Sequence, residues 1–117
     1  MKWTQNPDAI QGEGFDTLVV SLETDDVEVM QSSEILYREL KARGYKVLFD
    51  DRKLTSEEKR AEFPRFKNSV VIEIGREGLS RDGRVKLISV SSGASERILL
   101  EETLEKLEEF KNANGRL

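Results

Sequence analysis

The side chains that most often carry out catalysis or bind transition metals are absent from this chain. Its 117 residues include no cysteine and no histidine. This excludes Ser-His and Cys-His nucleophile pairs, thiolate or imidazole metal sites, and an imidazole general base near neutral pH. Carboxylates, lysines and hydroxyls remain as the available chemistry. The composition therefore disfavours an enzyme, and we expect no catalytic residue, no metal and no cofactor.

The most conspicuous chemically active group is Asp50-Asp51-Arg52, which follows the short apolar run Val47-Leu48-Phe49. Such a run predicts a strand, and in an open α/β sheet ligands bind beyond the carboxyl ends of the strands. The two aspartates do not form a paired acid and base, because neighbouring residues of a strand point to opposite faces. Their position favours binding over catalysis.

Positive charge is concentrated in the middle of the chain, although the net charge of the whole is −4. Residues 1–40 carry a net charge of −7 and residues 68–117 a net charge of −1. Residues 41–67 hold nine basic and five acidic side chains, a net charge of +4. The middle segment is where the sequence predicts contact with a phosphate backbone. A chance scatter of surface lysines and arginines is the alternative interpretation.

Strands and helices alternate in the first part of the chain. The run Phe15–Leu22 predicts a strand that is buried on both faces. A helix is expected over Val27–Arg43, with Leu40 central on its buried face, and Gly44 ends it. Tyr45–Asp50 is the second strand. A helical connection of this length makes the two strands parallel, with a right-handed crossover.

Two helix starts carry the signature of a capping box, in which an acidic residue follows the capping residue by three positions. Asp25 with Glu28 is predicted to open the first long helix, and Thr55 with Glu58 to open a short second helix. Pro64 stops the second helix, because proline disrupts a helix interior.

The second half of the chain is expected to complete the sheet. Val70–Ile74 is the most strand-like run and predicts a third parallel strand in the centre of the sheet. Asp82-Gly83 predicts a turn, so Val85–Val90 is expected to run antiparallel to the third strand. Ser91–Ser95 is expected to be a flexible loop. The last helix is predicted from apolar residues at helical spacing, Leu100, Leu104 and Leu107.

On its length the chain is one domain, which we place at residues 15–117. Residues 1–14 show no periodicity and contain Asn6-Pro7-Asp8 and Gly12-Glu13-Gly14, so we predict a linker or flexible segment there. No apolar run is long enough to span a membrane, and the first residues lack the hydrophobic region of a signal peptide. We therefore expect a cytoplasmic protein without a membrane partner.

From Phe15 to Lys111 the chain resembles the anticodon-binding domain of the class II aminoacyl-tRNA synthetases for histidine, glycine, threonine and proline, most closely the prolyl form. The resemblance is carried by LYRELKARGYKVLFDDR at residues 36–52, VVIEIGREGL, DGRVKL and a final acidic helix. It implies a three-layer α/β fold, with a mixed, mostly parallel sheet of about five strands and three helices. It also implies attachment to a catalytic core.

The same resemblance points to individual residues that bind RNA. Asp51 and Arg52 match the charged turn after the second strand, and Lys59 matches a lysine in the helix that follows. Glu77 matches a charged position after the third strand. Cations would contact phosphates, and carboxylates would accept hydrogen bonds from base edges. The expected RNA-binding residues are Asp51, Arg52, Lys53, Lys59, Glu77 and Lys86.

Two phenylalanines after the second predicted helix have alternative interpretations. Phe63 and Phe66 either stack on an unpaired base or belong to the core, and we favour the core.

We expect a module that binds the tRNA anticodon loop without chemistry of its own, as part of a prolyl-like synthetase. The alternative is a protein-interaction or accessory domain that keeps the fold without tRNA recognition. The acidic total charge motivates it, as does the stretch Ser89–Ser92, where prolyl forms carry basic residues. Cations gathered beyond the strand ends favour RNA, and an apolar patch there favours a protein partner. The cations in question are Lys53, Lys59, Arg60 and Arg65.

Overall fold

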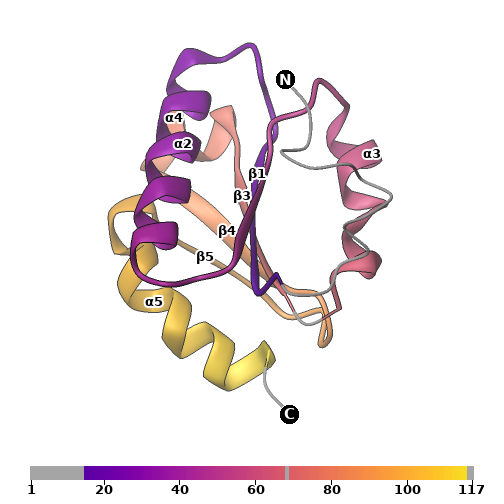
Figure 1. The fold of residues 1–117 in the computed structure, drawn as a ribbon. Helices are drawn as coiled ribbons and strands as arrows, with labels where there is room; N and C mark the ends of the chain where they lie inside the picture. Colours follow the sequence, from indigo (N-terminus) through magenta and orange to yellow (C-terminus); the bar gives the residue numbers. More distant parts are fainter. Residues whose placement is uncertain (1–14, 68, 116–117) are drawn as a thin grey trace.

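The computed structural model describes residues 15–67 and 69–115, which form a three-layer α/β fold (Figure 1). In chain order its elements are β1 (Thr17–Ser21), α2 (Val27–Ala42), β2 (Val47–Asp50), α3 (Ser56–Arg60), a 3₁₀ turn (Phe63–Arg65), β3 (Val70–Ile74), α4 (Arg76–Asp82), β4 (Arg84–Ser89), β5 (Ser95–Leu99), a second 3₁₀ turn (Leu100–Glu102), α5 (Thr103–Phe110) and a π-helical turn (Lys111–Gly115). One face of the sheet carries α2, α4 and α5, and the other carries α3. The linker predicted over residues 1–14 lies outside the described residues.

The sheet has the strand order β2-β1-β3-β4-β5, and the predicted strand directions are confirmed. Strand β1 pairs in parallel with both β2 and β3. Strand β4 runs antiparallel to β3, and β5 runs antiparallel to β4. The carboxyl ends of the three parallel strands therefore lie at one edge of the sheet, where β4 begins.

Helix α2 follows the prediction except at its cap. Asp26, not Asp25, is the N-cap residue, and its side chain accepts a hydrogen bond from the Val29 N–H. The prediction of Asp25 is wrong because Asp25 lies in the turn before the helix, while Asp26 has the extended backbone of a capping residue. At the other end, Gly44 has a φ of 95°, as expected for a left-handed terminus. The predicted capping box of Thr55 and Glu58 is confirmed at the start of α3.

Two apolar clusters cover the two faces of the sheet. The larger includes Leu40 and Leu107 and lies beneath α2 and α5. The smaller lies beneath α3 and the first 3₁₀ turn and includes Phe63 and Phe66, which are 8% and 1% exposed. The interpretation of both phenylalanines as core residues is therefore confirmed.

The layer that carries α3 is incomplete. The smaller cluster draws its fully buried strand residues from β1, β2 and β3, while from β4 only the partly buried Ile88 packs at its margin. On β4, Val85 and Leu87 are buried in the larger cluster, and Lys86 between them is exposed on the opposite face. Among residues 15–67 and 69–115, no helix covers the face of β4 and β5 on the α3 side, which is called the uncovered face below.

Two elements correct the sequence predictions. Residues Arg76–Asp82 form helix α4, for which the sequence gives no prediction. The predicted Asp82-Gly83 turn lies at the end of this helix, where Gly83 caps it with a φ of 68°, so the described residues contain four α-helices where three are expected. Helix α4 has no buried residue and therefore no apolar periodicity to detect. The expected loop Ser91–Ser95 is a turn that leads directly into β5, whose one buried residue is Ile98.

Within the described part of the chain, none of the helices combines the length and the hydrophobicity required to cross a lipid bilayer.

Candidate nucleic-acid interface

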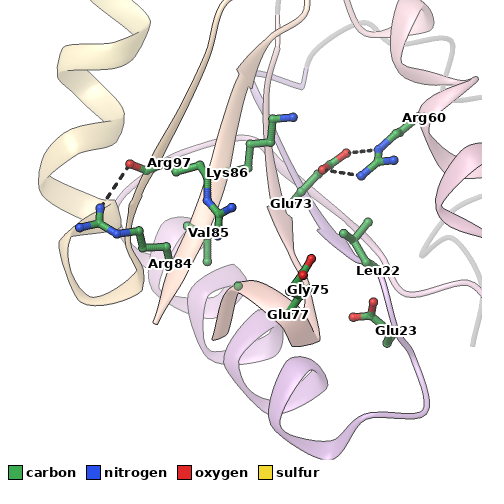
Figure 2. Close-up of a pocket in the computed structure, with 11 residues that line it drawn as sticks. Leu22, Glu23, Arg60, Glu73, Gly75, Glu77, Arg84, Val85, Lys86 and Arg97 are labelled. Carbon is green, nitrogen blue, oxygen red and sulfur yellow. Dashed lines mark hydrogen bonds and ion pairs between the residues drawn. The ribbon is translucent and has the colours of Figure 1, made fainter. Parts of the chain in front are cut away.

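A hollow of about 240 Å³ lies at the edge of the sheet where β1 and β3 end and β4 begins (Figure 2). It is formed by the carboxyl ends of two parallel strands, which is the position where the sequence predicts a ligand. Both acidic and basic side chains line it. The charged lining residues are Glu23, Arg60, Glu73, Glu77, Arg84, Lys86 and Arg97.

Three of these cations stand on the uncovered face of β4 and β5. Lys86 lies directly opposite Arg97 in the antiparallel pair, and Arg84 points to the same face from two residues before Lys86. Arg84 and Arg97 approach Asp82 at 3.5 and 3.8 Å, whereas Lys86 has no hydrogen bond or ion pair with any residue that the structure describes. Like charges at opposed positions of a sheet are destabilising. On its other side Lys86 lies opposite Glu73 of β3, but both oxygens of that carboxylate accept hydrogen bonds from Arg60. An anionic ligand at this face would reduce the repulsion between Lys86 and Arg97.

Arg60 closes the hollow from the side of α3. Its Nε and Nη2 atoms donate to the two carboxylate oxygens of Glu73, at 2.8 and 3.1 Å. These hydrogen bonds raise the pKa of the Arg60 guanidinium further above its usual range. Glu73 is 3% exposed, while the Arg60 side chain is 48% exposed. The pair fixes α3 to β3 and leaves part of the guanidinium facing solvent.

Helix α4 forms the opposite wall and approaches β4 very closely. A Cβ atom at Gly78 would lie 2.6 Å from the main-chain oxygen of Arg84, so glycine is required for this contact. Glu77 on α4 is exposed and lies 3.8 Å from Arg81. Glu23 is engaged, because its Oε1 atom accepts a 2.6 Å hydrogen bond from the Arg76 N–H.

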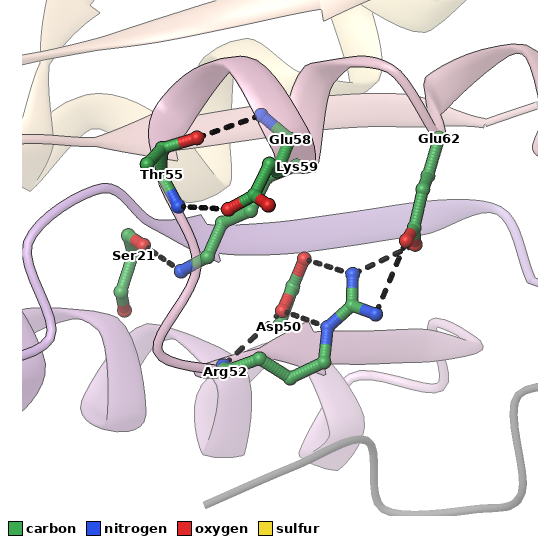
Figure 3. Close-up of polar contacts among 7 residues, drawn as sticks. All are labelled: Ser21, Asp50, Arg52, Thr55, Glu58, Lys59 and Glu62. Atoms are coloured by element: carbon green, nitrogen blue, oxygen red, sulfur yellow. Dashed lines mark hydrogen bonds and ion pairs between the residues drawn. The ribbon is translucent and has the colours of Figure 1, made fainter.

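A second polar group occupies the end of β2 (Figure 3). The Arg52 guanidinium lies between Asp50, with Nε to Oδ1 at 2.9 Å, and Glu62, with Nη2 to Oε1 at 2.7 Å. Burial alone would lower the pKa of Arg52, but the hydrogen bonds to the two carboxylates outweigh it and raise the pKa. The side chain is 13% exposed. Arg52 thus joins β2 to the segment that follows α3.

Lys59 belongs to the same interior group. It is 1% exposed, and its Nζ atom donates a hydrogen bond to the main-chain oxygen of Ser21 at the end of β1. Burial lowers the pKa of the Lys59 ammonium. In this conformation the ammonium faces the interior of the protein.

Asp51 is buried, with 2% of its surface exposed. Neither carboxylate oxygen accepts a hydrogen bond from any residue that the structure describes. Burial raises the pKa of this carboxyl above its ordinary value. The neighbouring Lys53 is exposed.

The six residues expected to bind RNA therefore divide between two places. Glu77 and Lys86 line the hollow, while Asp51, Arg52 and Lys59 lie inward at the end of β2, with Lys53 exposed beside them. Of Lys53, Lys59, Arg60 and Arg65, whose gathering beyond the strand ends would favour RNA, only Arg60 lines the hollow, where it joins cations from β4 and β5. Arg84 is not among the residues predicted to bind RNA, although its spacing from Lys86 in a strand signals a shared face. Arg97 is not among them either.

Asp51→Asn is expected to raise the free energy of unfolding at pH 7 by on the order of 1 kcal/mol, because a neutral amide is less costly to bury unpaired than a carboxylate. Burial raises the folded-state pKa of Asp51 above the ordinary value of 3.8, so the native state loses stability as pH rises from that value through the raised folded-state pKa. The gain in Asp51→Asn should therefore shrink as pH falls through the raised pKa and be absent below about 3.8. Urea unfolding of the variant and the original chain at several pH values measures the difference.

Asp25→Asn is the matched control, because the Asp25 side chain is 86% exposed and the same charge is removed. Its difference from the original chain should stay small at every pH. An Asp51→Asn chain that is less stable at pH 7 would show that the carboxylate has a stabilising partner.

The chain thus has a three-layer α/β fold with a polar hollow at the carboxyl ends of its parallel strands, and its structural class is α/β. The family described as "Anticodon binding domain" matches residues 16–110. The chain belongs to this family, the anticodon-binding domains of class II aminoacyl-tRNA synthetases.

Curated relatives agree with this assignment. The chain is similar to a proline–tRNA ligase of Exiguobacterium sibiricum, with 34% identity over 91 residues that cover 78% of this chain and 16% of that protein. It is also similar to a proline–tRNA ligase of Geobacter sulfurreducens, with 37% identity over 101 residues that cover 80% of this chain and 16% of that protein. The chain thus spans about one sixth of these relatives.

A solved structure shares the fold. It is the RNA binding domain of threonyl-tRNA synthetase from Cryptosporidium parvum, which superposes with a TM-score of 0.65 at 23% identity and covers 81% of this chain and 23% of that one. The expected fold class is confirmed, with the correction to the number of helices given above.

Proposed function

We propose that this domain binds the anticodon loop of a tRNA in the hollow and on the uncovered face of β4 and β5. The observation that carries the proposal is Lys86, which forms no ion pair with a described residue and lies opposite Arg97 and beside Arg84. Like charges retained side by side on an open face favour a polyanionic ligand. The domain contributes binding and no chemistry of its own.

The hollow also offers hydrogen-bonding groups for an unpaired base. Proteins read the sequence of an RNA loop through hydrogen bonds to the exposed edges of its bases. The exposed carboxylate of Glu77 can accept hydrogen bonds from base donors, and the outer side of Arg60 can donate to a phosphate. Family membership supports this assignment of ligand class, because the relatives are proline–tRNA ligases.

We further infer that the domain acts beside a catalytic core. The relatives are about six times longer than the aligned region, and a core would contact the rest of the tRNA. The isolated domain should therefore bind an anticodon stem-loop weakly, so the assay needs low salt.

Lys86→Ala is expected to weaken binding of a proline anticodon stem-loop and to reduce the slope of log affinity against log salt by about one. Lys46→Ala is the charge-matched control. Lys46 is also exposed, but it precedes β2 at the far side of the sheet. A fluorescence anisotropy titration at several salt concentrations, repeated with a scrambled anticodon, gives both quantities.

Equal affinity for both loops, with unchanged slopes in both variants, would favour the second candidate function. That candidate is a protein-interaction module, and a specific feature supports it. Val27 and Ile35 on α2 are 70% and 57% exposed, on the face of the sheet opposite the cations.

A further inference from the structure

A second hollow, of about 510 Å³, lies on the uncovered side of the sheet near the turn between β4 and β5. Its floor is apolar and comes from the first 3₁₀ turn and from β4 with the residue after it. The lining side chains that matter here are Phe63, Pro64, Ile88 and Val90, with Arg60 and Lys67 at the rim.

The two hollows are neighbours, because Arg60 lines both. Arg60 uses Nε and Nη2 to hold Glu73, so its Nη1 atom remains for a ligand. Lys67 is exposed and has no hydrogen bond or ion pair within residues 15–67 and 69–115. The second hollow therefore has an apolar floor between Arg60 and Lys67, and it lies next to the cationic surface that includes Lys86.

The two hollows differ in the chemistry they offer. Glu23, Glu73 and Glu77 line the first hollow, and of these only the exposed Glu77 accepts no hydrogen bond from a described residue. None of the described residues that line the second hollow is acidic. A carboxylate acceptor in the first hollow suits a base that presents hydrogen-bond donors on its edge. The apolar floor of the second hollow suits the flat face of any base, and the cations at its rim suit the phosphates on either side of that base.

We propose that the second hollow holds an unpaired base adjacent to the base in the first, with Arg60 at the phosphate between them. The inference rests on the proposed function and deepens it. The two hollows together bind two consecutive nucleotides, each through a different kind of contact. The first hollow discriminates between bases, and the second accepts any base, through packing on Pro64 and Ile88.

The test combines an abasic scan of the loop with a variant that fills the second hollow. Ser91 lines this hollow and is exposed, so Ser91→Leu places bulk in it. Ser92→Leu is the matched control in the same turn, where the side chain does not line the hollow. Each change removes one weak hydroxyl contact, at 3.5 Å for Ser91 and 3.2 Å for Ser92. Melting curves confirm that both chains fold.

With the original chain, removing the base at either of two adjacent loop positions should weaken binding roughly 5-fold, the equivalent of about 1 kcal/mol of lost packing or hydrogen bonding. In Ser91→Leu, one of these penalties should disappear and the other persist. Ser92→Leu should keep both. Changing the identity of the base at the affected position should alter affinity by less than about 3-fold, below the loss of one stacked base.

A single sensitive position, or two penalties that survive in Ser91→Leu, would overturn this inference. If Lys86→Ala still weakens binding in that case, the proposed function stands. If the anticodon loop and its scrambled form bind equally and no abasic position matters, both fail.

Discussion

Leu40→Ala is expected to lower the free energy of unfolding by about 2–5 kcal/mol. Leu40 is fully buried on α2, in the larger apolar cluster against the sheet. Truncation removes buried methyl groups and leaves a cavity, since a packed core relaxes only partly around the lost atoms. Urea unfolding followed by circular dichroism measures the loss as a shift in midpoint at a constant m-value.

Ile35→Ala is the control on the same helix. Its side chain is 57% exposed, so the loss should stay within about 0.5 kcal/mol, as for a typical surface change. Equal losses in the two variants would mean that α2 is rotated from the orientation described here.

Lys59→Ala should produce the second large loss, about 2–4 kcal/mol, although it removes a charged residue. The side chain fills buried space comparable to that of a core methionine, and its Nζ atom holds the main-chain oxygen of Ser21. Truncation opens a cavity and leaves that oxygen without this donor. Chemical denaturation of the variant measures the loss.

Lys59→Met separates volume from charge. Methionine keeps most of the length and needs no charge to be buried, so its loss should be clearly smaller than that of alanine. The opposite pattern, an unchanged stability in Lys59→Ala with a reduced salt slope of RNA binding, would place Lys59 at the surface. It would support the direct phosphate contact expected from the resemblance.

Much of the fold follows from two patterns in the sequence, which are apolar residues at helical spacing and short continuous apolar runs. Leu36 and Leu40 mark the buried face of α2, and a helix between successive apolar runs makes β1, β2 and β3 parallel. These elements are predictable because each buries a continuous apolar face. Helix α4 and strand β5 escape prediction for the converse reason, since between them they contribute the single buried residue Ile98.

The candidate site is predictable in position but not in composition. Its place at the ends of the parallel strands follows from topology. The identity of its cations cannot be predicted in the same way. Lys86 and Arg97 lie opposite each other because β4 and β5 pair in a particular register, and the sequence does not show that register. Lys59 and Arg52 lie farther inside than the charge pattern indicates, because charge counts treat every cation as exposed, whereas long side chains can reach interior acceptors. Their contact with RNA stays a prediction.

The most direct test of RNA binding at the uncovered face is a map of backbone amide chemical shifts during titration with a proline anticodon stem-loop. The largest changes should fall on β4, β5, α3 and the start of α4, and be reduced with a scrambled loop. Changes confined to α2 and α5, or no changes at an RNA concentration that saturates binding, would contradict the account.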